Sequence, residues 1–155
     1  MPAVTAILFC VVVGISDGDT LTARCDSAAD ASAQTIKVRL AEVDAPEHQQ
    51  AFGTRSRKHL ASLCCKPSAE VRPIAPAGGL DRYGRTVAHV SCIGVDANTE
   101  QVRAGMACIF FDRYVIDRRL YALQEEARTA HRGLWAGAIR SHPGNGAGLR
   151  GSQNG

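Results

Sequence analysis

The chain has 155 residues, a length that predicts a single domain with a core of its own and argues against a multidomain architecture. The hydrophobic fraction of 45% and the charged fraction of 21% are ordinary for a soluble globular protein, and an aromatic fraction of 5% predicts an aliphatic core. The net charge of +3 suits a polyanionic partner, but many unrelated proteins carry the same balance, so charge alone assigns no function.

The apolar run over residues 3–13 resembles the hydrophobic region of a signal peptide, but no Lys or Arg precedes it and no small-residue cleavage site follows. The run is too short to span a bilayer. We therefore expect residues 9–15 to form the first core strand. The alternative is a wrongly assigned start site that hides a signal peptide.

Three strands are predicted before the first helix, over residues 10–15, 20–24 and 35–40, where apolar and polar residues alternate. Residues 16–19 between the first two strands predict a tight turn, in which Gly18 is free to take a positive φ. Because the strands follow one another directly, they predict an antiparallel meander.

A helix is predicted over residues 52–65, where Phe52, Leu60 and Leu63 recur at helical spacing. Two more strands follow, over residues 69–74 and 86–92, separated by a Gly- and Pro-rich loop.

Two further helices close the predicted fold. Asn98 and Gln101 have the spacing of a capping box, so Asn98 should cap a short helix that ends near Gly105. Apolar residues recur at helical spacing over residues 116–127 and predict an amphipathic third helix, and Trp135 should dock its end onto the core.

This order of elements predicts an α+β fold, mainly β: a five-stranded barrel of the OB type with three helices. The domain should span residues 7–136. Residues 137–155 are rich in Gly, Ser and Asn without periodicity and predict a disordered tail.

The cysteines show no C-x-x-C motif and no metal-finger spacing, so they are either buried small hydrophobes or partners in one or two disulfides. If the hairpin turns about the Asp17–Gly18 bond, Cys10 and Cys25 face each other and can form a disulfide. If it turns one residue later, the two cysteines are diagonal neighbours. The full set is Cys10, Cys25, Cys64, Cys65, Cys92 and Cys108.

Residues 39–47 form the stretch on which the functional hypothesis depends. The strand ends at Arg39 and Leu40, and Pro46 prevents its continuation, so Asp44 and Glu47 should lie just beyond the strand end. An arginine and two carboxylates at one strand end indicate a metal-assisted phosphodiester site.

Two other motifs should join this stretch, Asp17-Gly18-Asp19-Thr20 and Asp81-Arg82-Tyr83-Gly84-Arg85. Alone, the first could be an ordinary hairpin turn and the second a solvated surface turn. Residues 44–47 could likewise be only a turn into a helix. The combination in this order is far more specific than any one motif.

With these motifs, and with Asn98-x-x-x-Val102-Arg103-Ala-Gly105 and Arg132-Gly-Leu-Trp135, the chain resembles the staphylococcal nuclease family, also known as thermonucleases or micrococcal nucleases. The resemblance covers residues 11–135, and the fold of that family is the same OB barrel.

The resemblance implies a Ca²⁺ ion held by Asp19, Asp44 and the backbone carbonyl of Ala45, where the best-known member has Thr. Oxygen ligands of this kind suit a hard cation. The resemblance also implies that Arg39 and Arg85 clamp the phosphate. Guanidinium groups match phosphate oxygens and the added charge of a five-coordinate transition state.

Glu47 matches the catalytic carboxylate, which takes or orients the proton of the attacking water. Asp17 would lie behind the metal ligands and shape their loop. Arg82 and Tyr83 beside Arg85 suit a terminal phosphate and a stacked base. The chain departs from the best-known member at Phe111 and Arg113, where tyrosines stand; Arg113 could contact phosphate instead.

The implied function is that of a calcium-dependent endonuclease cutting DNA and RNA with little sequence specificity, leaving 3′-phosphates. We expect a monomer without a membrane segment, and the family and the cysteine count slightly favour a secreted or periplasmic location. The alternatives are a non-catalytic module that binds nucleic acid or protein, and a plain OB single-strand binder, which would carry more aromatic residues.

Overall fold

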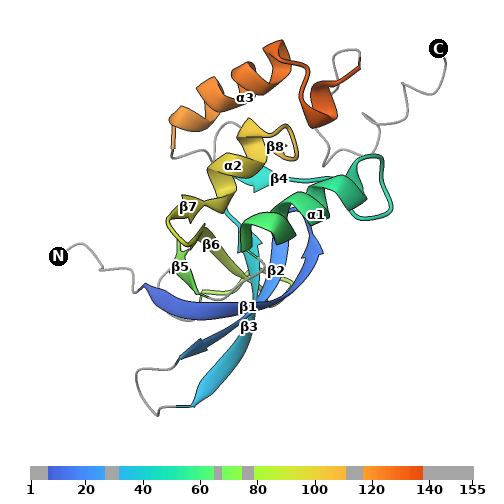
Figure 1. Ribbon diagram of the computed structural model, residues 1–155. Helices are drawn as coiled ribbons and strands as arrows, with labels where there is room; N and C mark the ends of the chain where they lie inside the picture. The colour runs from blue at the N-terminus through green and yellow to red at the C-terminus, as the bar shows by residue number, and fades with distance from the viewer. Residues whose placement is uncertain (1–6, 27–31, 65–67, 75–78, 111–116, 138–155) are drawn as a thin grey trace.

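The computed structural model describes residues 7–26, 32–64, 68–74, 79–110 and 117–137. Five strands form a closed barrel in these residues, and three helices lie at one end of it (Figure 1). The barrel strands are β1 (Leu8–Asp17), β2 (Thr20–Asp26), β3 (Ala33–Leu40), β5 (Ala69–Pro73) and β6 (Thr86–Cys92). The predicted five-stranded barrel with three helices is therefore confirmed.

The first three strands form the predicted antiparallel meander, with β1 paired to β2 and β2 to β3. Cys10 faces Cys25 across the first pair, and the two form the predicted disulfide with Cα atoms 4.0 Å apart. The expected turn about Asp17–Gly18 was wrong: Asp17 pairs with Thr20, and register shifts after Val12 and after Ile15 bring the cysteines opposite each other. A second disulfide, Cys64–Cys92, joins α1 (Gly53–Cys64) to β6. Cys108 is a free, buried thiol.

Barrel closure comes from a parallel pairing of β3 with β6, in which Arg39 is registered with Val87 and Leu40 with Ala88. The side chain of Asn98 stabilises this seam: its amide nitrogen donates to the carbonyl of Ala41 at 2.9 Å, and its oxygen accepts from the backbone of Val90 at 3.0 Å.

The prediction that Asn98 caps the second helix was wrong. Helix α2 (Ala97–Arg103) is capped by Asp96, whose side chain accepts a hydrogen bond from the backbone of Thr99 at 3.0 Å. Asn98 and Gln101, the two residues of the expected capping box, are instead fully buried inside the fold. An amide that has several buried backbone partners gains more there than at a solvated helix end.

Two short strand pairs complete the structure. Strand β7 (Val95–Asp96) extends the sheet next to β6, and β4 (Val43–Asp44) pairs with β8 (Cys108–Ile109). Helix α3 (Arg119–Thr129) is followed by a 3₁₀ turn at Gly133–Trp135. Trp135 is buried against Ala127 of α3 and Cys108, as expected for a residue that docks this end of the chain.

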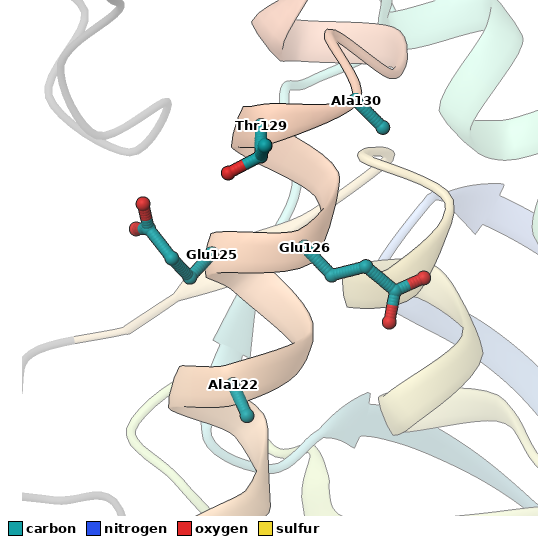
Figure 2. Close-up of a pocket in the computed structure, with 5 residues that line it drawn as sticks. All are labelled: Ala122, Glu125, Glu126, Thr129 and Ala130. Atoms are coloured by element: carbon teal, nitrogen blue, oxygen red, sulfur yellow. The ribbon is translucent and has the colours of Figure 1, made fainter.

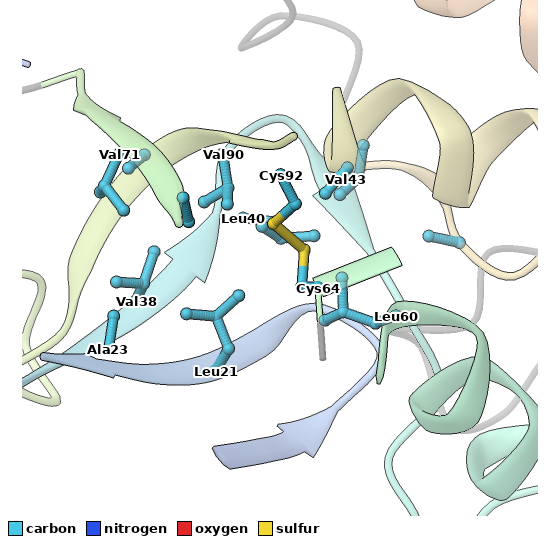
Figure 3. Close-up of a cluster of buried hydrophobic side chains, with 14 of the residues drawn as sticks. Leu21, Ala23, Val38, Leu40, Val43, Leu60, Cys64, Val71, Val90 and Cys92 are labelled. Carbon is cyan, nitrogen blue, oxygen red and sulfur yellow. A yellow bond between two sulfur atoms is a disulfide. The ribbon is translucent and has the colours of Figure 1, made fainter. Parts of the chain in front are cut away.

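The core is aliphatic, as the composition predicted. Figure 3 shows its central side chains converging from the barrel strands and from α1, with the Cys64–Cys92 disulfide among them. The labelled aliphatic members are Leu21, Ala23, Val38, Leu40, Val43, Leu60, Val71 and Val90.

Strand β1 has two different faces. Cys10 is buried, whereas Phe9, Val11 and Val13 on the opposite face are exposed. The expected first strand is confirmed, but only one face of it belongs to the core. In the described part of the chain, no helix is long and apolar enough to cross a membrane. The expected tail beyond residue 137 lies outside the described residues and stays a prediction.

Candidate active site

The hairpin turn between β1 and β2 carries Asp19, which is 6% exposed. Its Oδ1 accepts a hydrogen bond from Thr20 Oγ1 at 2.8 Å, and its Oδ2 accepts one from the backbone of Ala45 at 2.8 Å. Both carboxylate oxygens are thus fixed, one by the hairpin and one by the segment after β4.

Gly18 is required in this turn for a reason that the sequence did not reveal. It does not adopt the positive φ that we expected. A Cβ atom at Gly18 would overlap the hydroxyl of Ser56 on α1 and touch the side chain of Ala45. The carbonyl of Gly18 accepts a hydrogen bond from Gln101 Nε2 at 2.7 Å, so the turn is packed tightly between two helices.

Arg39 joins the two predicted metal ligands at the end of β3. Its Nη2 donates to Asp44 Oδ1 at 3.0 Å and lies 3.5 Å from Asp19 Oδ2. Its Nη1 donates to the carbonyls of Leu40 at 2.9 Å and Val43 at 2.7 Å. All three charged side chains are mostly buried, so their charges interact with little screening by solvent.

The pKa of Asp44 is raised from its usual value to about 7. Burial is the largest cause, and the neighbouring Arg39 opposes it. The negative charges of Asp19 and Glu47 raise the pKa further. The site therefore concentrates more negative charge than one guanidinium offsets, which favours an additional cation.

The donor set at this position fits a hard divalent cation. Asp19 and Asp44 supply two buried carboxylates, and Ala45 contacts Asp19 through its backbone. Within the described residues, no three His, Cys, Asp or Glu side chains form a metal cluster. A cation here would therefore need carbonyl and water oxygens as well, which is common for Ca²⁺.

Glu47 lies in an exposed turn directly after these residues. Its backbone N–H donates to Gln50 Oε1 at 2.9 Å, and the next residue, His48, donates its backbone N–H to Asp17 Oδ1 at 2.9 Å. Asp17 thus ties the Glu47 turn to the β1–β2 hairpin. Gln50 and His48 carried no sequence signal, because their roles depend on the shape of the turn.

Arg85 lies immediately before β6, two residues from Val87, which is registered with Arg39 across the parallel pair of β3 and β6. Asp81 orients Arg85: the Nε of Arg85 donates to Asp81 Oδ2 at 2.8 Å, and its backbone N–H donates to Asp81 Oδ1 at 2.8 Å. Burial would raise the pKa of Asp81, but the hydrogen bonds from Arg85 and Tyr83 outweigh it, and the pKa is lowered. Asp81 belongs to the predicted motif, yet we had assigned it no role.

Tyr83 presents its ring to solvent, and two guanidinium groups lie close to it. The ring is 5.0 Å from the guanidinium carbon of Arg82 and 5.1 Å from that of Arg85. Arg82 also donates to the Tyr83 hydroxyl at 3.0 Å. Such a ring can stack on a base while the cations meet phosphates. The remaining predicted contact residue, Arg113, lies outside the described residues, as does Phe111.

A shallow depression on the outer face of α3 is a separate feature. Figure 2 shows the carboxylates of Glu125 and Glu126 pointing to either side of the helix there. Neither is a predicted site residue, and carboxylates do not suit a phosphate ligand. This depression therefore takes no part in the candidate site.

Comparison with known proteins gives a consistent result. The family model described as Staphylococcal nuclease homologue matches residues 37–137. A protein of Haemophilus influenzae named an uncharacterized endonuclease is 43% identical over 127 residues, which cover 82% of this chain and 66% of that protein. The micrococcal nuclease of Shigella flexneri is 36% identical over 144 residues, which cover 85% of this chain and 76% of that protein. Protein ParB of Escherichia coli is 33% identical over 136 residues, which cover 81% of this chain and 71% of that protein.

Proposed function

Because the chain belongs to the staphylococcal nuclease family, we propose that it is a calcium-dependent endonuclease that hydrolyses DNA and RNA and leaves 3′-phosphates. The observation that carries the proposal is the buried pair Asp19 and Asp44 joined by Arg39, next to the turn that presents Glu47. This arrangement combines a cation site, a phosphate-binding group and an accessible carboxylate.

Asp19, Asp44 and the carbonyl of Ala45 would hold the Ca²⁺ ion, whose contribution when bound is to polarise a phosphate oxygen. Arg39 in β3 and Arg85 just before β6 would bind the phosphate. Their charges would stabilise the additional negative charge of the five-coordinate transition state.

Glu47 would accept or orient the proton of the attacking water. A water oxygen would then form a bond to phosphorus while the bond from phosphorus to the 5′-oxygen breaks. The 5′-oxygen would take a proton from solvent and leave as a hydroxyl, and the phosphate would stay on the 3′ side. The exposure of Glu47 suits this role, because water and substrate must both reach it.

Broad substrate use follows from the kind of contacts that the site offers. Guanidinium groups recognise phosphate, which every nucleotide carries, and the exposed ring of Tyr83 can stack on any base. The two disulfides, Cys10–Cys25 and Cys64–Cys92, favour an oxidising compartment as the place of action.

The test is a nuclease assay on plasmid and single-stranded substrates, with Ca²⁺ or with a chelator. We expect cleavage of both substrates with Ca²⁺, 3′-phosphate ends, and no cleavage in chelator. Mg²⁺ should substitute poorly, because it demands stricter octahedral geometry. Binding without any cleavage would instead support the non-catalytic alternative, and full activity in chelator would exclude the metal assignment.

A further inference from the structure

Helix α1 carries three basic residues and no acidic residue. Arg55, Arg57 and Lys58 are exposed, whereas Ser56 and Leu60 on the other side are buried against the core. Arg55 and Lys58 are three positions apart and are therefore neighbours on the helix surface. We refer to these three basic residues as the α1 basic face.

Five other arginines in the described part of the chain pair with carboxylates, although Arg24, Arg82 and Arg118, which are also exposed, form no such pair there. Those pairs are Arg72–Glu70, Arg103–Glu100, Arg119–Asp117, Arg128–Glu125 and Arg132–Glu126.

By contrast, no carboxylate among the described residues forms an ion pair with the α1 basic face. Arg55 lies over the ring of Phe52, with its guanidinium carbon 5.4 Å from the ring centre, and Arg57 Nε donates to the carbonyl of Ile15 at 3.0 Å. The positive charge of this surface is therefore not offset locally, which favours a polyanion.

The α1 basic face is also continuous with the candidate active site. The helix begins at Gly53, where a Cβ atom would overlap the carbonyl oxygen of Glu47, so the helix start and the Glu47 turn are packed together. Figure 1 shows this turn leading from β4 into α1. On the other side, the bond from Arg57 to Ile15 fixes the helix to the strand that leads into Asp19.

We propose that the α1 basic face binds the phosphate backbone of the substrate strand beyond the nucleotides at the cut. The inference rests on the proposed nuclease function and extends it. Charge complementarity identifies the occupant as a nucleic-acid strand, and continuity with Glu47 places that strand on the path of the scissile phosphate. The protein should therefore favour long substrates over dinucleotides.

The test compares two variants with the same change in net charge. Arg55→Gln with Lys58→Gln removes two unpaired charges from the α1 basic face. The matched control, Arg72→Gln with Arg103→Gln, removes two charges that pair with carboxylates elsewhere. Arg57 stays unchanged, because it also holds the helix in place. Circular dichroism verifies the fold of both variants.

The first readout is binding of a fluorescent single-stranded oligonucleotide in chelator, by anisotropy over a series of salt concentrations. Each phosphate contact to a single strand contributes about 0.7 to the magnitude of the slope of log K against log salt. Because the α1 variant lacks two such contacts, the magnitude of its slope should be smaller by about 1.4. The control should keep the wild-type slope. The inference would be overturned if the slope of the α1 variant were unchanged or if the control variant lost as much. It would also be overturned if the wild type did not bind the oligonucleotide.

The second readout separates the inference from the proposed function. With Ca²⁺, the α1 variant should cleave a dinucleotide like the wild type but show a higher KM for the long strand. If the α1 variant and the wild type had equal KM values for the long strand, the α1 basic face would not be a binding surface. Absence of cleavage by the wild type would refute the nuclease function, while the binding slopes in chelator would still decide the inference.

Discussion

Arg39 Nη2 lies 3.0 Å from Asp44 Oδ1, so the predicted phosphate clamp and a predicted metal ligand form one hydrogen-bonded unit. The guanidinium is also held by the backbone carbonyls of Leu40 at the end of β3 and Val43 in β4, which leaves it little freedom to move. A phosphate bound by Arg39 would therefore lie next to the carboxylates that would hold the cation.

The first prediction concerns Arg39→Ala. Removing the guanidinium leaves two mostly buried carboxylates without their cation, so the metal-free variant should lose on the order of 3 kcal/mol of unfolding free energy at pH 8. Added Ca²⁺ should restore much of this stability, because a bound ion would replace the missing charge. Urea unfolding with Ca²⁺ and with chelator measures both effects. Equal stability of the variant and the wild type in chelator would contradict the prediction.

The second prediction follows from the raised pKa of Asp44. The pKa is about 7 in the folded protein and near 3.8 in the unfolded chain, so between these values the folded state binds more protons. This contribution to stability is complete below about pH 4 and is lost as the pH rises through 7.

Asp44→Asn removes this titration. In chelator, the unfolding free energy of the variant relative to the wild type should therefore increase between pH 5 and pH 8. Urea unfolding at both values checks this, and an unchanged difference would show that Asp44 has an ordinary pKa.

The third prediction concerns Glu47→Ala. The side chain is exposed, so the fold and the binding of a nucleotide should survive the change. Turnover should fall by about 10²–10⁴ if Glu47 handles the proton of the water. Single-turnover cleavage by the purified variant is the measurement, with circular dichroism as the control. Near-normal cleavage would remove Glu47 from the site.

The fourth prediction assigns Asp81 a positioning role through Arg85. Asp81→Asn keeps the shape of the side chain but weakens its bond to Arg85, so kcat should fall by up to about 10²-fold with little change in KM. Arg85→Ala should cost about 10²–10³-fold. The double variant should be no slower than Arg85→Ala alone, because both changes act through one guanidinium. Additive losses would mean that Asp81 acts independently.

The fifth prediction uses two glycines of the same hairpin. Gly18→Ala places a methyl group into Ser56, so it should displace Asp19 and weaken Ca²⁺ binding. Gly14→Ala is the matched control, because nothing lies closer than 4.0 Å to a Cβ at that position. Isothermal titration calorimetry with Ca²⁺ compares them. Wild-type affinity in Gly18→Ala would show that the turn tolerates the added methyl group.

Local patterns predicted much of the fold. Alternation predicted the meander, because it depends on residues close in sequence. The Cys10–Cys25 disulfide was predicted correctly but from the wrong turn: the hairpin turns about Gly18–Asp19, and two register shifts in β1 bring the cysteines opposite each other. The Cys64–Cys92 disulfide and the buried amide of Asn98 were missed, since their partners lie in other elements and no local rule connects them.

In the candidate site, too, features that depend on the order of residues were predicted, and features that depend on packing were not. The order of the motifs predicted that Asp19, Arg39 and Asp44 lie together, and the structure places them within hydrogen-bond or ion-pair distance. The reason for Gly18 and the role of Asp81 depend on packing that appears only in three dimensions. The catalytic and metal-binding roles of these residues stay predictions until the variants are measured.

The parallel seam between β3 and β6 has a kinetic consequence. The hairpins of the meander join residues close in sequence, whereas the seam registers Arg39 with Val87, far along the chain. Contacts of long sequence separation form late, because closing the intervening loop costs entropy. Since Arg39 lies in this seam and Arg85 directly precedes β6, activity should return in the slowest phase of refolding, after the circular dichroism signal of the meander.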